Sequence, residues 1–490
     1  MPCATVTTTP LATHGTALGL LAIVFGCGGG SGGADPFTGL TLVSAPSTFA
    51  PMCNGAPQSG TNYPNSKVEP FVAVDPVNPD HLIGVWQQDR WSTTGSNGPV
   101  TGVSFDRGKT WARSLAPLSR CAGGNLSNGG DYERASDPWV TISRGGIAYQ
   151  VSVSFNTSAQ APFKAILASR STDGGLTWSE ATALARDTDA DFVLDKESVT
   201  ADPDDPRFVY AVWDRLTAQT NPDPTRATGP TWFTRLVDGQ WELARPIYDP
   251  GLDAQTIANQ IAVLNGTLIN LFVLITRASA DTPDRHVAVL RSPDKGVTWP
   301  DPPVIIEELR SIGVFDPKSR RRVRSGELIP AIAADPTSGK LYVAWQDARF
   351  SGGVREAIAL SVSADGGVTW SAPRQVNQAP QAPAFTAALA IAPGGKLGLT
   401  YYDLRRDDPS DQSTLATTYW LSTSADGGST WQEIALTGAF NLRNALMGPM
   451  YFLGDYEGLA ADGADFIPLF AACESGRPND PTDIFVKAGG

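Results

Sequence analysis

The chain has 490 residues, a formal net charge of −13 and only three histidines. The negative charge argues against a nucleic-acid partner and against direct binding to an anionic membrane surface. The histidines, His14, His81 and His286, are far apart in the sequence, which argues against a multi-histidine metal site and against histidine-based catalysis.

The N-terminal segment predicts export. Leu18–Gly26 is an apolar run too short to span a membrane comfortably, and Cys27 follows it, ahead of the glycine-rich tether Gly28–Gly33. This order is similar to a bacterial lipoprotein signal, although the segment before the apolar run lacks Lys and Arg. We expect lipidation at Cys27, with ordinary secretion or a misassigned start as alternatives. Residues 1–34 are then signal and tether, residues 35–490 form one domain, and the lipid is the membrane contact of a cell-envelope protein.

Three cysteines remain beyond the tether. Outside the cytoplasm such residues form disulfides, and three is an odd number. We expect a Cys53–Cys121 bridge, which would tie the N-terminal arm to the chain beyond it, and a buried free thiol at Cys473.

A motif of the form Ser-x-Asp-x-Gly-x-Thr-Trp occurs five times. The aspartate can cap a tight turn, the glycine supplies a positive φ, and the indole can insert between neighbouring sheets. The copies are Ser104–Trp111, Ser171–Trp178, Ser292–Trp299, Ser363–Trp370 and Ser424–Trp431.

The spacing of the motif predicts an all-β fold. The intervals are similar except for one that is nearly double, and a degenerate copy, Arg235–Trp241, lies inside the long interval. A repeat of this size suits a four-stranded antiparallel blade, and a fixed period is the signature of a β-propeller. The motif would then be the turn between the third and fourth strands of each blade.

The end of the chain predicts how the propeller closes. Asp455–Gly463, Phe466–Phe470 and Thr482–Val486 read as three strands without a fourth. Thr41–Ser44 can supply the missing edge and so remove an exposed one. We therefore expect seven four-stranded blades and a monomer; six blades with a C-terminal extension is the alternative.

The repeated motif is identified as the Asp-box of the sialidase-like β-propellers, and the similarity spans the first six units. Sortilin-type receptors, photosystem assembly factors and xyloglucan-hydrolysing enzymes resemble it too. The sialidase resemblance implies an exported exo-α-sialidase-like glycosidase with an arginine triad, an Asp acid/base and a Tyr nucleophile activated by Glu. The Arg-Ile-Pro sequence of that family is absent, because Val68–Pro70 stands in its place.

The candidate site lies on the rim opposite the Asp-boxes, where polar residues end or begin the strands and converge on one axial funnel. For acid/base catalysis we consider Asp137 and Asp89. For a Tyr–Glu partnership the candidates are Tyr401, Tyr402 or Tyr456 with Glu197, Glu327 or Glu457. The expected substrate-binding residues are Arg134, Arg215, Arg349, Arg405, Asp214, Asp347 and Asp403. The alternative for the Asp–Arg pairs is a structural ring of ion pairs between blades.

The expected partner is therefore carbohydrate, and no cofactor is expected. The acidic loops Asp187–Asp191 and Asp407–Asp408 can be read as calcium sites or as solvated loops, and the second reading is preferred. Two rival functions remain open: a non-catalytic propeller lipoprotein that binds glycan or protein, and a propeller polysaccharide lyase.

Overall fold

The computed structural model describes residues 35–157, 164–189, 191–217, 227–277, 282–300, 302–463, 465–473 and 480–489. The proposed lipidation site, Cys27, lies outside them. Within the described residues the regular structure is almost entirely strand, with two short 3-10 turns, η2 (Arg349–Ser351) and η3 (Leu442–Ala445). No helix in this part of the chain is long and apolar enough to cross a membrane.

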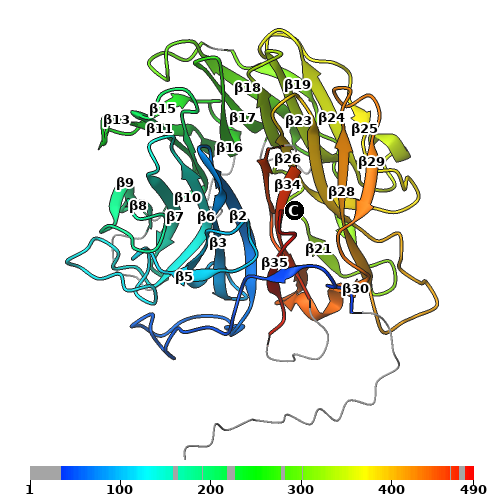
Figure 1. Ribbon diagram of the computed structural model, residues 1–490, viewed down its shortest axis with the longest axis horizontal. Coiled ribbons are helices and arrows are strands. Elements are labelled where there is room, and N and C mark those ends of the chain that lie inside the picture. The colour runs from blue at the N-terminus through cyan, green and yellow to red at the C-terminus, as the bar shows by residue number, and fades with distance from the viewer. Residues whose placement is uncertain are drawn as a thin grey trace, which may run out of the picture. The chain divides into compact units, whose positions relative to one another are not determined.

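The strands of residues 36–490 follow one another as antiparallel sheets, from blue to red in Figure 1. The first two groups are β2 (Lys67–Asp75), β3 (Asn78–Arg90), β4 (Ser96–Ser104) and β5 (Ala112–Ser114), then β6 (Arg134–Ile142), β7 (Ala148–Phe155), β8 (Lys164–Ser171) and β9 (Thr182–Asp187). The next two are β10 (Phe192–Ala201), β11 (Phe208–Thr217), β13 (Thr231–Val237), β14 (Gln240–Trp241) and β15 (Arg245–Tyr248), then β12 (Thr228–Gly229), β16 (Ala254–Leu264), β17 (Thr267–Thr276), β18 (Asp284–Ser292) and β19 (Val304–Glu308).

The remaining sheets complete the domain. They are β22 (Ala331–Asp335), β23 (Lys340–Asp347), β24 (Ala357–Ser363) and β25 (Arg374–Gln375), then β26 (Ala384–Ile391), β27 (Leu397–Asp403), β28 (Ala416–Ser424), β29 (Gln432–Ala435) and β30 (Phe440–Asn441). The last is β33 (Gly458–Asp462), β34 (Asp465–Ala472) and β35 (Asp483–Val486), completed by β1 (Thr41–Leu42), which pairs with β35. The prediction that Thr41–Ser44 supplies the missing edge strand is confirmed.

The first strand of each sheet packs beside the first strand of the next, and the ring closes on itself. In order these strands are β2, β6, β10, β16, β22, β26 and β33, and β33 packs against β2. The protein is therefore an all-β propeller. Hydrogen bonds between Ser96 and Ala135 merge the first two groups into one eight-stranded sheet, so the count of seven separate blades stays a prediction.

The Asp-boxes are tight turns at the ends of third strands. In the third copy, Asp294 accepts the backbone N–H of Thr298 at 2.8 Å and its hydroxyl at 2.7 Å, and Ser292 accepts the N–H of Gly296 at 2.8 Å. The other four copies make the same three bonds, as expected for a self-contained folding unit. These hydrogen bonds, led by those from Thr177, hold the pKa of Asp173 at about 2.

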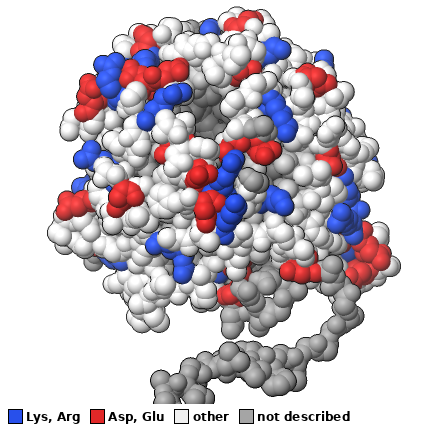
Figure 2. Space-filling model, viewed as in Figure 1, with Lys and Arg blue, Asp and Glu red and all other residues white. Residues whose placement is uncertain are grey.

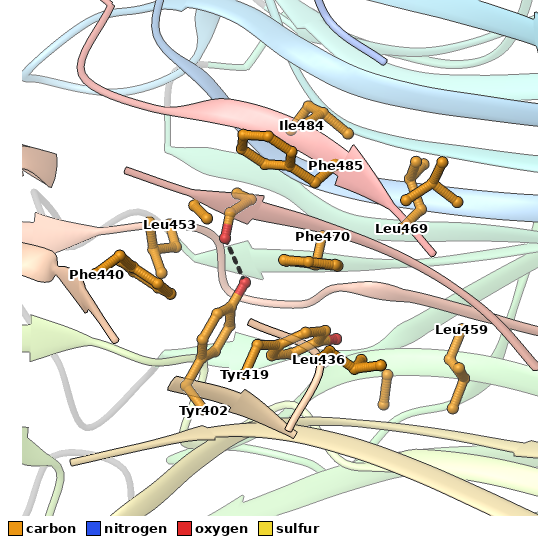
Figure 3. Packing of buried hydrophobic residues seen from close by; sticks show 14 of the residues in the cluster. Tyr402, Tyr419, Leu436, Phe440, Leu453, Leu459, Leu469, Phe470, Ile484 and Phe485 are labelled. Carbon is orange, nitrogen blue, oxygen red and sulfur yellow. Dashed lines mark hydrogen bonds between the residues drawn. The ribbon is translucent and has the colours of Figure 1, made fainter. Parts of the chain in front are cut away.

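The closing sheet carries the largest apolar cluster (Figure 3). The rings form a chain in which Tyr402 contacts Tyr419, Tyr419 contacts Phe470, and Phe470 contacts Phe485. The Tyr402 hydroxyl donates a hydrogen bond of 2.7 Å to the Ala471 carbonyl. Aromatic packing thus joins the last two sheets. The Cys53–Cys121 disulfide is present and Cys473 is a buried free thiol, which confirms both cysteine predictions.

A small additional sheet, which we call the rim sheet, departs from the repeat. It contains β20 (Val314–Phe315), β21 (Arg322–Arg324), β31 (Leu446–Met447) and β32 (Met450–Phe452). Two segments far apart in the chain meet here, because β21 pairs in parallel with β32. The pairing places Arg324 opposite Phe452.

Candidate active site

The inner strands share an irregularity that builds the candidate site. The register of five of them shifts by a bulge, and the first bulged residue has a positive φ in each: 54° at Glu69, 52° at Asp137, 49° at Lys196, 63° at Ala258 and 52° at Thr386. A bulge redirects side chains, and non-glycine residues with positive φ gather at functional sites. Three of the five carry charge.

These charged residues form a buried group with two others from the rim; we call Glu69, Asp137, Lys196, Arg324 and Asp455 the axial cluster. Lys196 Nζ lies 2.5 Å from Asp137 Oδ1 and 2.9 Å from Asp455 Oδ2. Arg324 forms a bidentate pair with Asp455, with Nε 2.7 Å from Oδ1. Oxygens of the three carboxyl groups all lie within 4.8 Å of one another. Within the axial cluster, two cations therefore face three closely spaced acids.

The axial cluster separates the pKa values of its acids. Burial first, and then the charge of Asp137, raise the pKa of Glu69 to about 8. Burial alone would raise the pKa of Asp137, but the charge and hydrogen bond of Lys196 lower it below its usual value. The pKa of Asp455 is also lowered, because Arg324 and Lys196 outweigh the effect of burial. At neutral pH one carboxyl group therefore carries a proton while its two neighbours are ionised.

A cavity of about 280 Å³, which we call the axial cavity, lies between the inner strands and is lined by Trp139, Gln260, Tyr456 and Glu457 among others. Asp137 and Lys196 of the axial cluster line a small adjoining hollow together with Trp139 and Tyr456. Figure 2 shows a hollow near the middle of one face, with acidic and basic side chains gathered beside it. The three carboxylates resemble a hard-cation site in their spacing, but the ammonium of Lys196 and the guanidinium of Arg324 lie against them. The set therefore fits an internally balanced site better than a metal centre.

The comparisons with known proteins concern the fold. No family model matches the chain, and no curated protein matches it. A solved microbial sialidase, Hadza Hz136, is 16% identical, covering 80% of this chain and 74% of its own, with a TM-score of 0.45. An α-L-arabinanase of Penicillium chrysogenum, solved with arabinobiose, is 14% identical, covering 73% of this chain and 95% of its own, with a TM-score of 0.43. A protein of unknown function from Dyadobacter fermentans is 13% identical, covering 92% of this chain and 98% of its own, with a TM-score of 0.45.

The five Asp-box turns and the closed ring of antiparallel sheets define the fold as an all-β propeller.

The propeller brings some of the predicted site residues together. Asp137 belongs to the axial cluster, and Tyr456 and Glu457 line the axial cavity. The Tyr456 hydroxyl donates to the Pro138 carbonyl at 3.1 Å. Glu197 is buried next to Asp137 and accepts the backbone N–H of Val153. Glu457 accepts the N–H of Ala471 at 3.0 Å, and burial raises its pKa well above the usual value.

Other predicted residues fasten the N-terminal arm instead. Asp89 accepts the hydroxyl of Ser47 at 2.6 Å and the N–H of Asn65 at 2.8 Å. Arg134 donates to Gln58 at 2.7 Å and to the Ser59 carbonyl at 2.8 Å. Its guanidinium carbon lies 4.3 Å from the centre of the Trp91 ring. Both side chains thus hold the segment that carries Cys53.

In the predicted substrate-binding pairs Asp347–Arg349 and Asp403–Arg405, each arginine forms an ion pair with the aspartate two residues before it. Arg349 Nε lies 2.9 Å from Asp347, whose other oxygen accepts the indole N–H of Trp345 at 2.8 Å. Arg405 is paired with Asp403 and also with Glu433. These are separate ion pairs rather than one set of arginines around a funnel.

The third predicted pair does not form. Arg215 pairs with Asp187 at 2.7 Å, its guanidinium carbon 3.6 Å from the centre of the Phe192 ring. Asp214 is buried and accepts the N–H of Ala258 at 2.8 Å. Adjacent residues on a strand point to opposite faces, which explains why Asp214 and Arg215 have different partners.

Tyr402 lies in the apolar cluster of Figure 3 rather than in the axial cluster. Conversely, Lys196, Arg324 and Glu69 were not among the residues expected at the site. Lys196 and Glu69 lie in the first half of inner strands β10 and β2, at the same bulge position as Asp137. Aligning the strand starts of the repeats would have revealed that correspondence. Arg324 had no such signal, because the rim sheet lies outside the repeat.

Proposed function

We propose that the protein is an exported glycoside hydrolase that removes terminal sugars from glycans, with the axial cluster as its reaction centre. The observation that carries the proposal is the opposite displacement of the Glu69 and Asp137 pKa values at carboxyl groups within 4.8 Å of each other. Glycoside hydrolysis generally needs one protonated and one ionised carboxyl group on either side of the scissile bond. Pairs of acids whose environments separate their pKa values mark such assignments.

In this proposal Glu69 is the general acid that protonates the leaving oxygen. Asp137 is the carboxylate that stabilises or attacks the developing cation at the anomeric carbon, and Lys196 keeps it ionised. The close approach of the carboxyl groups favours retention of configuration, since inverting enzymes keep them farther apart to admit a water. Tyr456 is not assigned the nucleophile, because its hydroxyl is engaged with Pro138 and its pKa lies well above the usual value owing to burial.

The finer form of the proposal is an exo-α-sialidase-like activity. The Asp-box array supports it, together with Arg324, whose side chain is 34% exposed at the axial cluster. A guanidinium at this position can form a bidentate pair with a sugar carboxylate. Arg324 takes the place of the four arginines expected from the sequence. Export and lipidation at Cys27 complete the proposal and rest on the N-terminal sequence alone.

The test is a panel of chromogenic glycosides, beginning with a sialoside and including arabinosides, with the wild type, Glu69→Gln and Asp137→Asn. Release from one glycoside that falls at least 100-fold in each variant supports the proposal, since a positioned acid contributes roughly 10²–10⁴-fold. Arg277→Gln, an exposed residue paired with Asp284, is the matched control and should retain activity. Release that is unchanged in both variants would remove the axial cluster from the mechanism.

A non-catalytic glycan- or protein-binding propeller is the second candidate. Two observations favour it: Arg349 and Arg405 are each paired with the aspartate two residues before them, and Glu69 is only 1% exposed. This candidate predicts no release from any glycoside but retained binding on a glycan array.

A further inference from the structure

A second hollow lies away from the axial cluster, beside the rim sheet. Its volume is about 670 Å³, within the range of small-ligand sites, and we call it the outer hollow. It shares no lining residue with the axial cavity. Its lining includes Ile312, Phe315, Arg320, Val354, Arg355 and Arg405.

The floor of the outer hollow is apolar and exposed. Ile312 is 47% exposed, Phe315 is 37% exposed and Val354 is 64% exposed, although large apolar side chains usually avoid water when they cluster. Exposed apolar patches bordered by polar groups mark binding surfaces on soluble proteins. The Phe315 ring offers a flat surface of the kind that stacks against the apolar face of a sugar.

The cations at this hollow differ in their pairing. Arg405 is neutralised by Asp403 and Glu433. Arg320 and Arg355 are exposed and make no ion pair among the described residues. The Arg320 guanidinium carbon lies 5.7 Å from the centre of the Phe315 ring, a contact that restricts its orientation. Two unneutralised arginines around one hollow are unexpected in a chain with a net charge of −13.

The loop that carries Ile312 is held in place by a buried carboxylate. Glu356, which is 1% exposed, accepts the backbone N–H groups of Ile312 at 2.6 Å and Gly313 at 2.7 Å, and the hydroxyl of Ser311 at 2.7 Å. A buried carboxylate holding successive donors sets the shape of the loop that carries Ile312. The hollow is therefore preformed, which lowers the entropic cost of binding.

We propose that the outer hollow binds an anionic saccharide unit of a polysaccharide. Arg320 and Arg355 take its sulfate or carboxylate group, and Phe315 and Ile312 take the apolar face of the sugar ring. The charge complementarity selects the anion, and the exposed aromatic floor selects a saccharide over a free inorganic ion. The inference extends the proposed function by naming the class of polymer, but binding here does not require the axial cluster to be catalytic.

The experiment measures binding of the full chain to three soluble polymers by titration calorimetry: a sulfated glycosaminoglycan, a polyuronate and neutral dextran. We expect affinity for one or both anionic polymers and none for dextran; the pair of anionic probes distinguishes sulfate from carboxylate recognition. In Arg320→Gln/Arg355→Gln the affinity should fall about 10-fold or more for each lost charge-assisted contact. Both side chains are exposed, so the thermal midpoint should stay unchanged.

Arg277→Gln/Arg207→Gln is the control, since it removes two exposed arginines that are paired with Asp284 and Asp205 elsewhere. Its affinity should match the wild type. Equal losses in both double variants, equal binding of dextran, or equally tight binding of a polyglutamate peptide would each overturn the proposal. Turnover of a small glycoside should be unchanged in Arg320→Gln/Arg355→Gln. A protein that hydrolyses nothing but still shows the charge-dependent binding would fail the proposed function and retain this one.

Discussion

The ammonium group of Lys318 lies 2.9 Å from the carboxylate of Asp407 and 2.6 Å from the carbonyl oxygen of Thr414. The carbonyl oxygens of Asp411, at 2.9 Å, and Asp408, at 3.3 Å, complete its surroundings. The loop that the sequence offered as a calcium site thus surrounds a side-chain cation. Lys318 belongs to the segment between β20 and β21, so the contact also fastens this loop to the rim sheet.

Replacing this cation should create a dependence on metal. Lys318→Met leaves Asp407 buried without its partner, which should lower the free energy of unfolding by about 3–5 kcal/mol. Millimolar calcium should then recover part of the loss, because the remaining ligands are oxygens suited to a hard cation. Thermal unfolding with and without calcium measures both effects. Lys109→Met, which removes an exposed charge, is the control, and an equal calcium response in wild type and Lys318→Met would contradict the idea.

The raised pKa of Glu69 predicts a pH dependence of stability. The pKa of Glu69 is about 8 in the folded protein, against 4.5 for a glutamate in the unfolded chain, so the folded state binds the proton more tightly. The stabilisation is full below pH 4.5 and is lost as the pH rises toward 8, with a slope of up to about 1.4 kcal/mol per pH unit. Urea unfolding at pH 5, 6, 7 and 8 should show this decline in the wild type.

Glu69→Gln should reduce that decline, because the amide cannot ionise; Glu197 and Glu457, whose pKa values burial also raises, keep their share of it. Asp137 and Asp455 act in the opposite direction: their pKa values are lowered, so their contribution is present at neutral pH and is lost only in acid. Asp137→Asn should therefore leave the slope between pH 5 and 8 in place. A wild type whose stability rises across this range would refute the assignment of the neutral acid to Glu69.

Tyr402 and Tyr456, two of the three tyrosines considered for the Tyr–Glu partnership, should behave alike in turnover if the carboxyl groups carry the chemistry. Tyr402→Phe removes a hydroxyl that donates to Ala471 in the core, which should cost about 1 kcal/mol of stability and leave any glycosidase activity within 10-fold of wild type. Tyr456→Phe removes the bond to Pro138 and should likewise retain activity. A loss of more than 1000-fold in Tyr456→Phe alone would instead identify a tyrosine nucleophile.

The features that could be predicted from the sequence are those encoded by a repeated local pattern. The Asp-box turns follow from such a pattern, because hydrogen bonding within one turn suffices to form them. The closing strand β1 follows from the strand count of the repeat, because the last unit lacks its fourth strand. The axial cluster could not be assembled in this way. Arg324 reaches Asp455 through a parallel pairing between β21 and β32, two segments that share no repeat. The Asp–Arg pairs misled because their spacing does not reveal whether a pair closes on itself, as Asp347–Arg349 does.

The Asp-boxes should matter for stability and not for activity. In the last copy the Ser424 hydroxyl donates to Asp426 at 2.8 Å and accepts the N–H of Gly428 at 2.9 Å. Ser424→Ala leaves that buried N–H without a partner, which should cost about 1–3 kcal/mol. Because this turn follows a third strand, it lies at the end of the propeller opposite the strand starts that form the axial cluster.

Urea unfolding and glycoside turnover of Ser424→Ala, measured beside Ser410→Ala in an exposed loop, separate the two effects. The expected result is a lower unfolding midpoint for Ser424→Ala alone, with unchanged kcat and KM in both variants. A selective loss of turnover at an unchanged midpoint would mean that the Asp-box face takes part in substrate binding. That result would move the search for the site to the other end of the axial cavity.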